Sequence, residues 1–252
     1  MKHLLAIGSI AVLLLACSDD ERIVRRGLPT GEVIPLKEAK LNIEHNATDN
    51  DTGFQGQIDS EGWQHLEIVG PNGAVLSFEG LGSLSSLGVT ELFFETVEPE
   101  NKDVPIDEML ENLPAGDYTI SGKAVENGEA LGETAGTAWL THVIPAGPEL
   151  LAPSRGARVP VGDLLMRWAP VTKTIDGGPV RIVSYQLIVE KDEPPHPHII
   201  GKRGLSMYLP ASVTAIKLPR EFFEAHTDYQ WEVLAIEQSG NQTLSSSEFA
   251  TQ

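Results

Sequence analysis

The sequence has very little cysteine and no long apolar segment. Cys17 is the only cysteine among 252 residues, so no disulfide can form within the chain. The longest apolar run extends from Leu4 to Leu15 and is interrupted only by Gly8 and Ser9. A membrane-spanning helix needs about 20 apolar residues, so this run is too short to be one.

Basic residues are also scarce, with 18 Lys and Arg against 36 Asp and Glu and a net charge of −18. The imbalance lies in one half of the chain. Residues 36–146 contain 20 acidic and four basic residues, a net of −16, whereas residues 147–252 contain 12 and 10, a net of −2. Such a surface repels phosphate backbones, so we expect no nucleic-acid partner. The acidity favours solubility, and it leaves open a divalent cation or a basic partner.

The sequence contains none of the common catalytic motifs. A nucleophile elbow is missing, since Leu84 stands where the first glycine should precede Ser86. The paired histidines of a zinc protease and the glycine-rich phosphate loop are missing as well. We therefore predict that the chain is not an enzyme.

The N-terminus carries the most specific signal. Lys2 and the apolar run after it fit a secretory signal peptide. The following Leu14-Leu15-Ala16-Cys17 resembles the lipobox of bacterial lipoproteins. The resemblance implies cleavage after residue 16, acylation of Cys17 and anchoring in a lipid bilayer. Ser18 in the next position favours the outer membrane of the cell envelope. Residues 17–35 are interpreted as the lipidated N-terminus and a flexible tether.

Residues 36–146 form the first predicted unit, an acidic β-sandwich. Short apolar or alternating segments bounded by turn residues predict its strands, at 39–45, 63–69, 74–79, 90–97, 118–125 and 137–143. One helix is expected between Asp103 as its cap and Pro114, with Pro105 in its first turn. The segment from Leu113 to Thr119 resembles a turn into a late strand of immunoglobulin-like sandwiches. We therefore expect an Ig-like fold for this unit.

Residues 147–252 form the second predicted unit. Leu164–Pro170, with Trp168, is similar to strand B of fibronectin type III domains, and Thr227–Ile236 is similar to strand F. Tyr229 occupies the position of that family's tyrosine corner. Further segments fit strands A, C, E and G, at 150–153, 180–191, 213–219 and 243–250. The whole chain resembles bacterial lipoproteins that end in a fibronectin type III domain. We thus predict an all-β fold with two tandem β-sandwiches.

One segment offers a candidate metal site. Asp49 and Asp51 stand two residues apart before Gly53, and Asp59 follows in the same segment. Calcium binds six to eight oxygen ligands, so these three carboxylates are candidate Ca²⁺ ligands. The same residues also favour an ordinary turn. No other cofactor is expected.

The four tryptophans could in principle form a sugar-stacking platform. Trp168 and Trp231 are expected in the core because of the fibronectin resemblance, and Trp63 and Trp139 because they lie in predicted strands. The leading prediction is therefore a non-enzymatic, membrane-anchored lipoprotein that binds or scaffolds an envelope or extracellular protein. A Ca²⁺- or carbohydrate-binding adhesin and a hydrolase with a carboxylate site in the acidic unit remain as alternatives.

Overall fold

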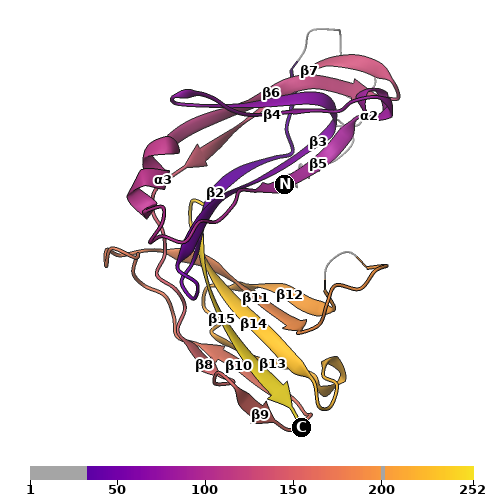
Figure 1. Cartoon of the computed structure of the whole chain (residues 1–252). Helices are drawn as coiled ribbons and strands as arrows, with labels where there is room; N and C mark the ends of the chain where they lie inside the picture. The colour runs from indigo at the N-terminus through magenta and orange to yellow at the C-terminus, as the bar shows by residue number, and fades with distance from the viewer. Residues whose placement is uncertain (1–32, 200–201) are drawn as a thin grey trace, which may run out of the picture.

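The structure is a computed structural model that describes residues 33–199 and 202–252. Nearly all of its regular elements are β-strands, which confirms the all-β fold class. Two separate hydrophobic cores lie in the two halves of the chain, as Figure 1 shows by the two groups of strands. The predicted signal peptide, Cys17 and the predicted tether up to residue 32 fall outside the described residues. Within the described ranges, no helix has the length and apolar character needed to cross a membrane.

The first unit confirms the six predicted strands and adds one. In chain order the strands are β1 (Val33–Pro35), β2 (Glu38–Asn46), β3 (Asp51–Gly70), β4 (Gly73–Glu79), β5 (Val89–Glu95), β6 (Gly116–Glu126) and β7 (Glu129–Leu140). The sequence prediction placed the residues of β1 in the tether. In the structure they pair in parallel with β7, just before the chain enters β2. Strand β3 begins twelve residues before the predicted start at Trp63.

Strand β3 is long because it belongs to both layers of the first unit. Its first part, residues 51–59, lies between β2 and β5. The register then shifts, and the second part, residues 63–70, lies between β4 and β6. Such an irregularity bends a strand, so one strand can pass from one sheet to the next. Its inward side chains Phe54, Ile58, Leu66 and Ile68 are all buried in the first core.

Two short helices cover the ends of this unit, α2 (Ser83–Leu87) and α3 (Ile106–Asn112). Helix α3 is the predicted one, and its apolar face packs on the first core as expected. The predicted cap is wrong, however. Pro105 holds the N-cap position and no side chain caps the helix, which begins at Ile106. Asp103 lies in the preceding turn, where its N–H donates to Glu100 O.

The second unit has the strand arrangement of a fibronectin type III domain. One sheet contains β8 (Leu150–Ala152), β10 (Leu164–Trp168) and β13 (Ala215–Leu218). The other contains β12 (Gly204–Pro210), β11 (Ile182–Lys191), β14 (Asp228–Glu237) and β15 (Gln242–Thr251), with β9 (Ala157–Val159) beside β15. The 3₁₀ helix η1 (Arg220–Phe222) lies between β13 and β14. The sequence prediction identified all of these strands except β9 and β12.

Trp168 and Tyr229 have structural positions in the second core. The Trp168 ring packs edge-on against Tyr185 at 5.6 Å between ring centroids, and both side chains are buried. The Tyr229 hydroxyl accepts a hydrogen bond of 2.8 Å from the backbone N–H of Glu224, five residues upstream. This contact fixes the turn into β14 in the manner of a tyrosine corner.

A short parallel pairing joins the two units. Residues 44–46 of β2 pair with residues 242–244 of β15. The larger sheet of the second unit is therefore continuous with the β2–β3–β5 layer of the first. In Figure 1 the two groups of strands meet at β2 and β15 and diverge toward β5 and β12.

Candidate functional site

The joined sheet lines a concave space of about 1010 Å³ between the two units. One wall comes from β2, β3, β5 and β7 of the first unit, and the other from β11, β12, β14 and β15 of the second. We call this cavity the inter-unit groove. Pockets for small molecules usually measure about 300–1,000 Å³, so the groove has room for a ligand larger than a single ion.

Strand alternation determines which side chains face the groove. Side chains point to opposite faces at successive positions of a strand. In β11 and β14, Leu187 and Val233 point into the second core, so their neighbours Gln186 and Glu232 face the groove. Tyr208 of β12 pairs with Gln186 and extends the same wall.

Four large apolar side chains are exposed on these walls. Phe93 is 61% exposed, Trp139 56%, Tyr208 69% and Val183 45%. Single exposed apolar residues are ordinary on protein surfaces, but several around one concave surface are typical of binding sites.

The position of Trp139 corrects the expectation that it belongs to a core. Its neighbours Ala138 and Leu140 in β7 are 5% and 0% exposed and fill the inner face. Alternation along β7 therefore turns Trp139 outward. Trp63 is buried as expected, at 3% exposed, so it offers no surface for a sugar.

Amide side chains link the two walls at the closed end of the groove. Gln242 of β15 donates from Nε2 to a carboxylate oxygen of Glu44 and, at 3.2 Å, to Gln55 Oε1. Gln55 in turn donates to Glu95 Oε1 at 2.9 Å. Leu234 and Leu244 are buried beside this network, at 4% and 8% exposed. The closed end is thus packed as well as hydrogen-bonded.

Asn241 pins the same junction from the turn between β14 and β15. Its side-chain oxygen accepts a 2.8 Å hydrogen bond from the N–H of Ile43, and its Nδ2 donates to the carbonyls of Thr141 and Val143 at 2.9 and 3.0 Å. Asn241 is 1% exposed, so these three bonds are shielded from water. The relative position of the two walls is therefore held by buried contacts.

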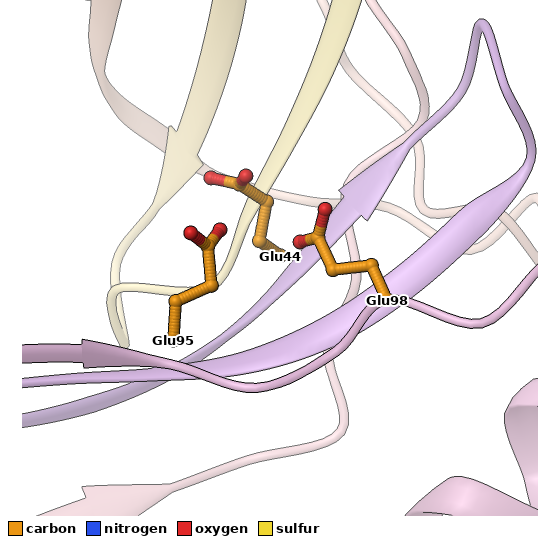
Figure 2. A group of neighbouring side chains, drawn as sticks. All are labelled: Glu44, Glu95 and Glu98. Carbon is orange, nitrogen blue, oxygen red and sulfur yellow. The ribbon is translucent and has the colours of Figure 1, made fainter. Parts of the chain in front are cut away.

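Three carboxylates gather beside the groove, Glu44, Glu95 and Glu98. Each has an oxygen within 4.8 Å of the others, and Figure 2 shows the three side chains pointing toward one another from β2, the end of β5 and the segment after it. We call this group the acidic cluster. Gly53, opposite Glu44 on β3, makes room for it, since a Cβ at that position would lie 2.6 Å from Glu98 Cγ.

Burial and mutual repulsion change the protonation of the acidic cluster. Burial raises the pKa of Glu98 from 4.5 to about 7, with further contributions from the charges of Glu44 and Glu95. Burial also raises the pKa of Glu44, although its hydrogen bond from Gln242 opposes that effect. Glu98 Oε1 is buried without a hydrogen-bond partner among the described residues. Close carboxylates that cannot all ionise share a proton, or they bind a hard cation such as Ca²⁺.

The structure does not bring the predicted Ca²⁺ ligands together. Asp49 and Asp51 lie at the β2–β3 hairpin, where Asp49 accepts a hydrogen bond from Asn46. Burial raises the pKa of Asp51, and the charge of Asp49 raises it further. Asp59 lies eight residues along β3, opposite Glu38. A strand rises about 3.3 Å per residue, so Asp59 is roughly 25 Å from the hairpin. The acidic cluster was missed because Glu44 is far from Glu95 and Glu98 in the sequence.

No family model matches the chain, and no curated protein matches it. Among solved structures, it is similar to the chicken CNTN1 FN1–FN3 domains, at 12% identity and a TM-score of 0.33, over 88% of this chain and 66% of that one. It is also similar to a two-domain fibronectin type III segment of chicken tenascin, at 13% identity and a TM-score of 0.29, over 84% of this chain and 97% of the other. These similarities are low, and the fibronectin-like fold of the second unit rests on its strand order and its tyrosine corner.

Proposed function

We propose that the chain is a non-enzymatic protein-binding module of the bacterial cell envelope, which binds its partner in the inter-unit groove. The observation that carries the proposal is the convergence of Phe93, Trp139 and Tyr208 on one concave surface while each remains more than half exposed. Aromatic side chains at the centre of an interface contribute much of its binding energy.

The fixed junction supports this function. Asn241, Gln242 and the buried leucines hold both walls in place, so little conformational order has to be gained when a partner binds. A preorganised surface binds more tightly than a flexible one with the same contacts.

Anchoring through acylated Cys17 is the second part of the proposal. It rests on the lipobox-like segment and on the solitary cysteine. Several acyl chains, each contributing about 0.8 kcal/mol per buried CH₂, would hold the protein durably at a bilayer. Ser18 favours the outer membrane.

The hydrolase alternative is less well supported by the geometry. A two-carboxylate hydrolase needs both acids to reach the substrate. Glu44 lines the groove, but Glu95 and Glu98 are not among its lining residues. The adhesin alternative keeps only Trp139 of its two candidate sugar-stacking residues, because Trp63 is buried.

Site-specific photocrosslinking in cells tests the proposed function. A photoreactive residue replaces Tyr208 in the groove or, as a matched control, Leu87 in α2, which is 70% exposed outside it. We expect a discrete protein adduct from position 208 and none from position 87. In parallel, Cys17→Ser should abolish fatty-acid labelling and release the protein from the membrane fraction. The absence of an adduct at 208, or the same adduct at both positions, would contradict groove binding, and a labelled Cys17→Ser variant would contradict the anchor.

A further inference from the structure

The charges that line the groove are unbalanced. Its acidic residues are Glu44, Glu232 and Glu237, and Lys40 is the one basic residue among the described lining positions. Lys40 pairs at 3.1 Å with Glu38, which lies outside the lining. Glu237 is held within its own turn by the N–H groups of residues 239 and 241. Among the described residues, neither Glu44 nor Glu232 forms an ion pair, although the charge of the nearby Lys202 lowers the pKa of Glu232.

Glu44 lines the groove from the first unit, and Glu232 lines it from the second. Each is partly or fully buried, and the charge of Glu232 contributes to the raised pKa of Glu44. Burial also raises the pKa of Glu232, followed by repulsion from Glu190. Two desolvated carboxylates in one groove favour a cationic ligand there, because a positive charge within about 4–6 Å of a carboxylate stabilises its ionised form.

The remaining lining residues suit an extended polypeptide. Tyr208, Gln186 and Leu234 occupy paired positions on three neighbouring strands, and Phe93 and Gln57 are paired on the opposite wall. Each wall thus alternates apolar surface with an amide that can both donate and accept hydrogen bonds. An extended peptide presents side chains in alternation together with free backbone N–H and C=O groups, which match such walls.

We propose that the inter-unit groove binds an extended cationic protein segment, which deepens the proposed function by naming the class of partner. A lysine or arginine of that segment occupies the space between Glu44 and Glu232. Apolar side chains next to it pack against Phe93, Trp139 and Tyr208. An uncharged glycan would leave the two carboxylates uncompensated, and for that reason a peptide is favoured.

Fluorescence anisotropy with the purified full chain in detergent tests this inference. The probe is a labelled peptide of alternating arginine and valine, about eight residues long, which spans roughly 26 Å when extended. Peptides with glutamine or glutamate in place of arginine, and a linear hexamer of β-1,4-linked N-acetylglucosamine, serve as comparison ligands. We expect the arginine peptide to bind most tightly, with an affinity that falls as salt rises.

Four variants separate groove binding from general attraction to an acidic protein. Glu232→Gln and Phe93→Ala should each weaken the arginine peptide about tenfold, the loss typical of one interface contact of about 1.4 kcal/mol. Glu129→Gln removes one charge from the exposed β6–β7 hairpin, and Leu87→Ala removes an exposed apolar side chain outside the groove. Both controls should bind like the wild type. All four positions are exposed or half-buried, so folding is preserved and circular dichroism can verify it.

Several results would overturn the inference. Equal losses for Glu129→Gln and Glu232→Gln would show nonspecific attraction, and equal binding of the glutamine peptide would remove the role of charge. Binding of the saccharide instead would assign the groove to a glycan, and a dimer abolished by Phe93→Ala would assign it to a second copy. A crosslinked protein at position 208 without arginine-peptide binding would contradict only this inference. Peptide binding without any crosslinked protein would contradict only the proposed function.

Discussion

Glu98→Gln provides a quantitative test of the acidic cluster. In the folded protein the pKa of Glu98 is raised from 4.5 to about 7. At pH values between these two, the folded state therefore keeps a proton that the unfolded state has released. The free energy of unfolding must therefore fall as pH rises through this window. One pKa unit corresponds to about 1.4 kcal/mol, which gives a loss of at most about 3 kcal/mol, reduced by the solvent exposure of part of the side chain.

Glutamine has nearly the same shape and cannot ionise, so the variant should lack this loss. At about pH 4, where Glu98 is mostly protonated in both the folded and the unfolded state, the two proteins should have similar stability. At about pH 8 the variant should be more stable by up to about 3 kcal/mol. Because Glu44 and Glu98 interact, the measured midpoint belongs to the cluster as a whole.

The assay is urea unfolding followed by tryptophan fluorescence at both pH values, in the presence of EDTA so that no cation replaces the proton. Glu129→Gln, at an exposed position in the β6–β7 hairpin, is the matched control and should follow the wild type. Parallel pH profiles for the wild type and Glu98→Gln would refute the reasoning. An equal gain in the control would refute it as well, since it would reflect net charge alone.

Three further substitutions probe the framework. Asn241→Ala leaves the Ile43 N–H and two carbonyls without partners, so it should destabilise the protein by about 2–4 kcal/mol in urea unfolding. A change below about 0.5 kcal/mol would show that Asn241 does not stabilise the junction of the two units. Tyr229→Phe should lower the free energy of unfolding by about 1–2 kcal/mol, because the Glu224 N–H loses its hydrogen-bond acceptor. Thermal unfolding measures this change, and an unchanged stability would show that the tyrosine corner does not stabilise the fold. Gly53→Ala should displace Glu98 from the cluster and flatten the pH profile of stability, whereas an unchanged profile would show that Glu98 keeps its place.

Local patterns predicted the fold well where one face of a strand is buried. The alternation of Tyr185, Leu187 and Val189 correctly predicted β11, and all three side chains are buried. The pattern failed for the first part of β3, where the polar residues from Asp51 onward were considered as a turn or a candidate metal site and not as a strand. It failed for Trp139 too, because strand pairing alone decides which face of β7 points inward.

The candidate site was much harder to predict than the fold. Glu44, Glu98 and Glu232 are separated by tens to hundreds of residues, and no local motif marks any of them. Glu98 comes close to Glu44 because β2 and β5 both pair with β3, and Glu232 lines the same groove as Glu44 because β2 pairs with β15. Register between distant strands depends on packing of the whole molecule, which a local pattern does not encode.

The sequence by itself determined the all-β fold class, because strand periodicity is a local property. Its resemblance to fibronectin type III strands implied the strand order of the second unit and the buried positions of Trp168 and Tyr229. The sequence also determined that Cys17 can form no disulfide within the chain, because no second cysteine exists. Only the tertiary structure decided that the two units share a sheet and enclose a groove. It also decided that three glutamates meet beside that groove, because these features arise from contacts between residues far apart in the chain.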